Sequence, residues 1–160
     1  KQWREGYFKN GLNPTNSEGV SQKFSYIDYG VKAGVTVKIN GKNYIYANGM
    51  YTTRAPYWDN VFISPRTTNS SYNPGSEKIG SAELGYILHS NKLKLRATLF
   101  YTEFLNGSNT IVYFNDDIYT MINYTISGIN KRHYGGELAL EAPLYEGLSL
   151  TFATSMGQYK

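Results

Sequence analysis

The chain of 160 residues has no cysteine and only two histidines. Lack of cysteine excludes disulfide scaffolds, zinc–thiolate sites and cysteine nucleophiles. No run approaches the ~18 consecutive apolar residues of a membrane-spanning helix, and the mean hydropathy is only −0.46. Such averages do not register a transmembrane β-barrel, because only alternate residues of its strands face lipid.

Catalytic and metal-binding patterns are also missing. His89 and His133 have no partner at a spacing typical of a catalytic or metal site. Asp116 and Asp117 form an acidic pair of the kind that solvated loops carry. We therefore predict that the chain is not an enzyme and that it uses no metal and no cofactor.

Charge of one sign is not concentrated anywhere. The 16 basic and 12 acidic residues give a net charge of +4. The densest basic cluster is Lys131, Arg132 and His133, which is too small to indicate a nucleic-acid surface. We interpret the charges as solvated surface or lumen lining and predict no nucleic-acid partner.

Strict alternation is what the sequence has in abundance. Over residues 27–39 every second residue is apolar, and those between are polar or glycine. The apolar set is Ile27, Tyr29, Val31, Ala33, Val35, Val37 and Ile39. A period of two predicts a strand with one apolar and one polar face. The stretch is longer than the ~9–11 residues with which a tilted strand crosses a bilayer.

The same pattern predicts six strands, and their connections alternate in length. The strands are expected at about 24–39, 43–54, 79–88, 93–105, 131–142 and 148–159. Long loops, 55–78 and 106–130, alternate with short turns, as in outer-membrane barrels. We predict an all-β fold in which residues 1–160 form one partial domain. The alternation favours an antiparallel meander of about 6–8 long strands in a transmembrane β-barrel.

Sequence leaves the register of the second strand open. A two-residue turn at Asn40-Gly41 would place Tyr46 beside the apolar face of 31–39. A three-residue turn with a bulge would place Ile45 there instead.

Two sets of residues are candidates for function. The charged residues expected to line a wet lumen are Glu83, Arg96, Glu137 and Glu141. Aromatic rings in the loops offer stacking surfaces for ligands, and arginine pairs with carboxylates or phosphates. The loop candidates for ligand binding are Arg54, Tyr57, Trp58, Arg66, Tyr72, Tyr113 and Tyr119. The alternative is that these aromatics only pack the loops against one another.

Five short motifs follow one another between residues 53 and 141. They are Thr53-Arg54-Ala55-Pro56, Asn73-Pro74 with Ser76-Glu77-Lys78, Ala82-Glu83-Leu84-Gly85-Tyr86, Leu99-Phe100-Tyr101-Thr102, and Gly135-Gly136-Glu137-Leu138. In order and rough spacing they resemble the C-terminal barrel half of TonB-dependent outer-membrane receptors. Residues 20–52 further resemble receptors of this family from Bacteroidetes-like bacteria.

The resemblance implies a segment of a plugged barrel of the ~22-stranded kind in the bacterial outer membrane. Its partners would be outer-membrane lipid, the rest of the barrel, the plug domain, and a TonB complex reached through parts outside this chain. The implied function is import of a scarce ligand such as an iron chelate, a vitamin or a glycan.

The chain lacks a terminal aromatic, a plug and a TonB box, so we expect a fragment of a longer protein. A second hypothesis is a soluble extracellular β-sandwich or adhesin that binds carbohydrate, with the apolar faces forming an internal core.

Overall fold

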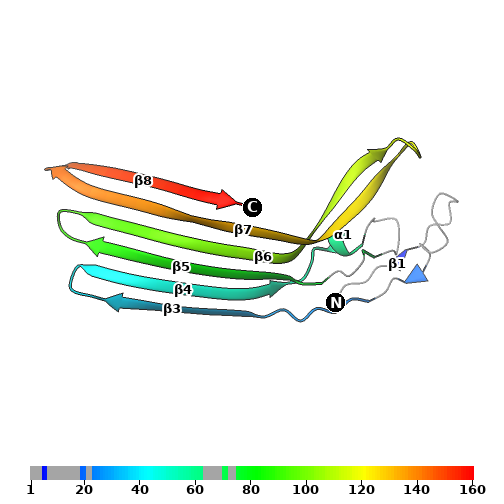
Figure 1. The fold of residues 1–160 in the computed structure, drawn as a ribbon, viewed down its shortest axis with the longest axis horizontal. Coiled ribbons are helices and arrows are strands. Elements are labelled where there is room, and N and C mark those ends of the chain that lie inside the picture. Colours follow the sequence, from blue (N-terminus) through cyan, green and yellow to red (C-terminus); the bar gives the residue numbers. More distant parts are fainter. Residues whose placement is uncertain (1–4, 7–18, 21–22, 63–69, 72–74) are drawn as a thin grey trace. The chain divides into compact units, whose positions relative to one another are not determined.

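The computed structural model describes residues 5–6, 19–20, 23–62, 70–71 and 75–160. Six strands form one antiparallel sheet in the order β3-β4-β5-β6-β7-β8 (Figure 1). Their bounds are Gly30–Lys38, Asn43–Arg54, Glu77–His89, Lys94–Asn115, Thr120–Tyr145 and Leu148–Tyr159. Each strand pairs with its neighbours in sequence, so the predicted all-β antiparallel meander is confirmed. The sheet is not closed into a barrel, and β3 and β8 are its edges.

Three smaller elements, β1, β2 and α1, complete the described chain. Strands β1 (Glu5–Gly6) and β2 (Gly19–Val20) form a separate antiparallel pair. Helix α1 (Trp58–Val61) is one turn long and lies between β4 and β5 in the sequence. No helix in the described ranges is long and apolar enough to cross a membrane.

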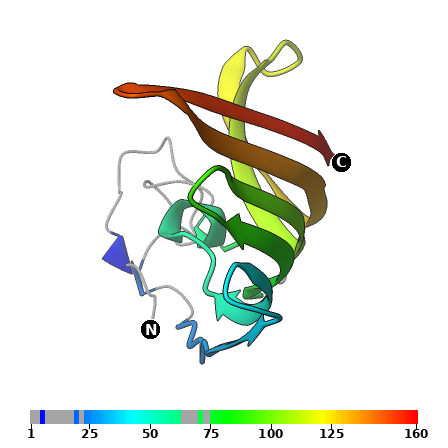
Figure 2. The same ribbon diagram turned by 90° about the vertical axis from the view of Figure 1, so that its left-hand side faces the viewer.

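The chain divides into two compact units, which we describe separately. The loop unit comprises the described residues of Lys1–Tyr29, Thr53–Lys78 and Leu105–Asn130. The sheet unit comprises Gly30–Thr52, Ile79–Phe104 and Lys131–Lys160. The strands of the sheet unit form a single curved layer (Figure 2).

The register of β3 and β4 settles the alternative that the sequence left open. Val37 lies opposite Ile45, and Val31 lies opposite Tyr51, as a three-residue connection requires. The side-chain Oδ1 of Asn40 accepts hydrogen bonds from the backbone N–H of Lys42 at 2.9 Å and of Asn43 at 3.0 Å. These bonds close the turn within residues 40–42 and place Tyr46 on the opposite face from Ile45.

Alternation gives the sheet unit two unlike faces. The apolar face has exposed side chains from every strand, among them Val31, Val35, Ile45, Leu84, Leu99, Leu138, Leu150 and Phe152. The polar face has the four charged residues predicted for a lumen. A hollow of about 450 Å³ lined by Ile45, Leu84, Leu99 and Leu138 shows that β4 to β7 present their apolar residues on one side.

Very little of the described chain is a buried core. The buried hydrophobic residues among the described ones are Tyr46, Val61 and Phe62. A single-layer sheet has no facing layer against which to bury its apolar side chains. Val31 is 62% exposed and Leu99 is 63% exposed, so the apolar face of the sheet unit is open.

The predicted loop 106–130 is mostly strand. β6 continues to Asn115 and β7 begins at Thr120, because the β-branched and aromatic residues on both sides of the turn favour pairing. The hydroxyls of Thr110 and Thr125 lie 2.8 Å apart across the hairpin. Asn115 closes the turn by accepting a hydrogen bond from the N–H of Asp117 at 2.9 Å.

Two other predicted boundaries also differ. The first strand was expected from residue 24, but β3 begins at Gly30. The predicted loop 55–78 contains α1, and β5 already begins at Glu77. The sequence pattern did not predict this helix, because it is only four residues long and is too short to show a helical period.

Candidate functional site

The five described ligand candidates all lie in the loop unit. Arg54 ends β4, Tyr57 precedes α1, and Trp58 is its first residue. Tyr113 lies in β6, and Tyr119 lies in the turn between β6 and β7. The structure brings Arg54 and Tyr57 together. Two other candidates, Arg66 and Tyr72, lie outside the described residues.

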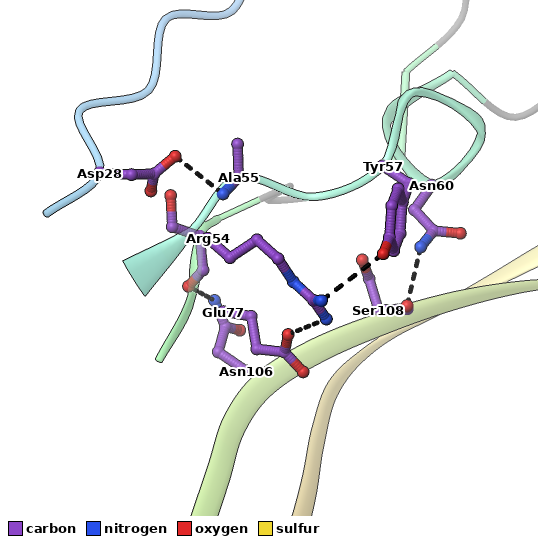
Figure 3. Close-up of polar contacts among 9 residues, drawn as sticks. Asp28, Arg54, Ala55, Tyr57, Asn60, Glu77, Asn106 and Ser108 are labelled. Atoms are coloured by element: carbon purple, nitrogen blue, oxygen red, sulfur yellow. Dashed lines mark hydrogen bonds and ion pairs between the residues drawn. The ribbon is translucent and has the colours of Figure 1, made fainter. Parts of the chain in front are cut away.

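Arg54 is the centre of a polar cluster that we call the clasp: Arg54, Tyr57, Asn60, Glu77, Asn106 and Ser108 (Figure 3). Its Nη2 donates to Oε2 of Glu77 at 2.5 Å, and its Nη1 lies 3.5 Å from the hydroxyl of Tyr57. The guanidinium carbon is 5.3 Å from the centre of the Tyr57 ring, within the range of a cation–π contact. The clasp therefore joins the end of β4 to the start of β5.

Hydrogen bonds between side chains and the backbone extend the clasp to Asp28 and hold Asn60 to Ser108. The N–H of Ala55 donates to Oδ2 of Asp28 at 2.8 Å. Nδ2 of Asn60 donates to the carbonyl of Ser108 at 2.8 Å, which ties α1 to β6 (Figure 3). Between these groups lies a hollow of about 40 Å³, about the size of a water molecule or one small polar group of a ligand.

The charges in the clasp limit what it can bind. Arg54 was predicted to pair with a ligand carboxylate or phosphate, but Glu77 already occupies one edge of its guanidinium. The ring of Tyr57 is 65% exposed and offers a stacking surface beside hydrogen-bonding groups. This arrangement suits a neutral polar ligand better than an anion, because an anion would have to compete with Glu77.

Trp58 has a packing role in the loop unit. Its ring centre is 4.6 Å from that of Phe62, which is 1% exposed, and Phe24 meets Phe62 at 5.9 Å. The hydroxyl of Tyr26 is buried with no hydrogen-bond partner among the described residues. Burial raises the pKa of this hydroxyl, and the nearby charge of Asp28 raises it further. For Trp58, the structure therefore favours the alternative that loop aromatics pack against one another.

Asn106 has a backbone conformation that most residues avoid. Its φ is 60°, in the left-handed region where asparagine is enriched. Its Nδ2 donates to the carbonyl of Ser76 at 3.1 Å, and its N–H donates to Oδ1 of Asn130 at 3.0 Å. Asn106 thus fastens the segment before β5 to the point where β6 and β7 enter the hairpin.

We expect Asn106→Ala to destabilise the loop unit more than Asn106→Gly. Both changes remove the bond to Ser76, but only alanine is strained at a φ of 60°. Strain of this kind costs about 1–2 kcal/mol, and this sets the expected difference in unfolding free energy between the two variants. Denaturant unfolding of the protein that carries this chain measures it. Equal midpoints for the two variants would contradict a left-handed Asn106.

The four predicted lumen charges lie in the sheet unit. Arg96 and Glu83 approach to 3.5 Å, and Glu141 accepts a hydrogen bond from Lys94 at 2.9 Å. Glu137 lies opposite Ser155 in the β7–β8 register. The Arg96–Glu83 and Lys94–Glu141 ion pairs are partly exposed, so each contributes at most about 1 kcal/mol to stability.

Tyr46, which was not among the predicted site residues, organises the cluster around Glu83 and Arg96. The hydroxyl of Tyr46 donates to Oε1 of Glu83 at 2.6 Å and lies 2.9 Å from the hydroxyl of Thr98. Nη2 of Arg96 donates to the same Tyr46 oxygen at 3.0 Å. The sequence would place Tyr46 on the same face as Glu83 and Arg96 only if the three-residue turn were assumed, because that turn puts Tyr46 on the polar face.

Comparisons with models of known families, with curated proteins and with solved structures found no match for this chain. Among the described residues, no group of three or more acidic, histidine or cysteine side chains could hold a metal ion.

Proposed function

We propose that this chain is part of the wall of a TonB-dependent receptor in the bacterial outer membrane, and that it takes part in nutrient import rather than catalysis. The observation that supports this most is the open apolar face of a single-layer antiparallel sheet. An apolar face of this extent needs a cover, because soluble proteins rarely expose apolar patches larger than a few hundred Å². Outer-membrane lipid is the cover that we propose.

Strand length supports the same proposal. β3, β4, β5 and β8 have 9, 12, 13 and 12 residues, and a tilted strand needs about 9–11 to cross the hydrocarbon layer. In lipid, the free backbone groups of edge strands must be paired. The remainder of a larger barrel would supply the strands that pair with β3 and β8.

The resemblance of the motifs to TonB-dependent receptors supplies the transport part of the proposal. A plug and a TonB-binding segment would lie elsewhere in the protein, and the proton-motive force would drive import. The ligand would be an iron chelate, a vitamin or a glycan. The clasp and the β6–β7 hairpin are the parts of this chain that we propose to face that ligand.

The other hypothesis was a carbohydrate-binding sandwich or adhesin with an internal apolar core. A sandwich needs a second sheet over the first. In the described ranges, the only other sheet is the pair of two-residue strands β1 and β2. No observation favours this hypothesis over the barrel.

A matched pair of adjacent residues tests the lipid-facing orientation. Leu150 lies on the apolar face opposite Ala142, and Thr151 lies on the polar face opposite Glu141. We expect a fluorophore on Leu150→Cys to be quenched by lipids with brominated chains, and one on Thr151→Cys to remain unquenched. The full protein in vesicles is the sample. Two labels that are equally open to a water-soluble quencher would refute the proposal.

The transport part needs its own measurement in cells. Uptake of ferric citrate, cyanocobalamin and a maltooligosaccharide would be compared with and without the gene, and with a protonophore. The proposal expects uptake of at least one class to require both the gene and the proton-motive force. Uptake that resists the protonophore would refute energised import.

A further inference from the structure

The apolar face of the sheet unit carries charge at one end only. Alternation places three charged side chains on this face, Glu103, Arg132 and Lys160. The register sets Leu138 opposite Thr154, which fixes Arg132 on the same side of β7 as Leu138. All other residues of this face in the sheet unit are apolar or uncharged. Contact with lipid chains, as proposed for this face, does not require charged side chains. The charged cluster at its edge therefore needs a further explanation.

Arg132 and Lys160 are direct cross-strand neighbours. The N–H of each donates to the carbonyl of the other at 2.9 Å, so their β-carbons lie about 5 Å apart. Nε of Arg132 also donates to Oε1 of Glu103 at 2.7 Å, while the Arg132 side chain stays 61% exposed. Glu103 pairs with Arg132 as Glu77 pairs with Arg54, but here Lys160 adds a second cation, so these three side chains carry a net positive charge that the Arg54–Glu77 pair lacks. Like charges placed directly opposite repel each other, so an anion between them would be stabilising.

An apolar hollow lies on the same face, further along the strands. It has a volume of about 450 Å³ and is lined by Ile45, Leu84, Leu99, Leu138 and Met156. Gly136 also lines it, and its lack of a side chain leaves room there. Gly136 and Leu138 follow Arg132 by four and six residues in β7, which is roughly 13–20 Å of strand. This distance fits the reach from a lipid headgroup into its acyl chains.

Tyr134 and Gln158 lie between the cations and the hollow. They are opposite each other in the register, and the Tyr134 hydroxyl donates to Oε1 of Gln158. A tyrosine with an apolar ring and a bonded hydroxyl is the type of residue that marks a membrane interface. The order along the face is therefore cations, interfacial tyrosine, apolar hollow.

We propose that this face holds one anionic phospholipid, with its phosphate between Arg132 and Lys160 and an acyl chain in the hollow over Gly136. The site rests on the proposed lipid-facing role of the sheet. The hollow is what favours a lipid over free phosphate, since free phosphate has no apolar part to place there. Each basic side chain near an anionic lipid is worth roughly a fivefold preference.

The test uses the full protein with a fluorophore on Met156→Cys, a position that is 83% exposed and lines the hollow. Vesicles of phosphatidylcholine receive brominated phosphatidylglycerol or brominated phosphatidylcholine as the quencher. Because Glu103 offsets one of the two cations, we expect the anionic lipid to associate about fivefold more strongly. The preference should vanish in Arg132→Gln with Lys160→Gln, and persist in Lys32→Gln, which removes one positive charge from the polar face.

The outcomes separate the two proposals. Quenching by neither lipid would refute the lipid-facing role and this site with it. Equal quenching by both lipids would overturn the site and leave the lipid-facing role standing. A preference that survives the loss of Arg132 and Lys160, or one that Lys32→Gln also abolishes, would show general charge attraction and would overturn the site.

Discussion

Replacing Gly85 by alanine is expected to destabilise the sheet unit by on the order of 3 kcal/mol. A β-carbon at this position would overlap the ring and the hydroxyl of Tyr46. Tyr46 is only 6% exposed and lies across β5 at the point where Gly85 has no side chain. The ring would have to move away from the strand.

The cost is large because moving the ring breaks several bonds at once. The Tyr46 hydroxyl is bonded to Glu83 at 2.6 Å and to Arg96 at 3.0 Å, and it lies 2.9 Å from Thr98. Hydrogen bonds to charged groups contribute about 1.5–3 kcal/mol each. A shift of the ring would also separate it from the Arg96 guanidinium, whose carbon is 5.5 Å from the ring centre.

Denaturant unfolding of Gly85→Ala measures this effect, and β5 contains its own control. A β-carbon on Gly80 would meet no atom of the described residues within 4 Å, so Gly80→Ala should change stability little. A double-mutant cycle gives the sharper result. In a Tyr46→Ala background, Gly85→Ala should be nearly neutral, because the clash has been removed. An unchanged cost in that background would show that Tyr46 is not what fills the space above Gly85.

Alternation was enough to predict the faces of the sheet but not its registers. A period of two assigns Leu138 and Glu137 to opposite sides, whatever the neighbouring strand does. The position of Tyr46 depended on a single residue in the turn, because shifting the register by one residue exchanges the faces. The hydrogen bonds of Asn40 decide between the two turns, and composition alone does not show which turn an Asn-Gly pair will adopt.

The clasp was predicted only in part, for a related reason. Arg54 and Tyr57 were candidates because of residue type and position in a loop. Glu77 and Asn106 were not candidates, because their roles depend on contacts between segments that are far apart in the sequence. These segments are the end of β4, the start of β5 and β6 at residue 106. Residue 106 was expected to begin the loop 106–130. In the structure, Asn106 instead has a left-handed backbone conformation within a strand that continues to Asn115.

The largest effect expected from the proposed lipid-facing role is that of Leu99→Arg. Leu99 is 63% exposed on the apolar face, and it packs against Gly136 near the middle of the sheet. An arginine on the lipid face of a barrel costs about 2–4 kcal/mol at the bilayer midplane. In water, the same substitution at an exposed position would cost less than about 0.5 kcal/mol. The solvent that covers this face therefore sets the size of the effect.

Ser155→Arg is the matched control, because Ser155 lies on the polar face opposite Glu137. The new cation would meet a carboxylate in a wet environment, so stability should be unchanged or slightly higher. Unfolding of the protein from lipid vesicles would give a lower midpoint for Leu99→Arg and not for Ser155→Arg. If both arginines were tolerated equally, the apolar face would not lie against hydrocarbon. A protein partner would then be the better explanation of the exposed leucines and valines, since its surface could pair an arginine that lipid could not.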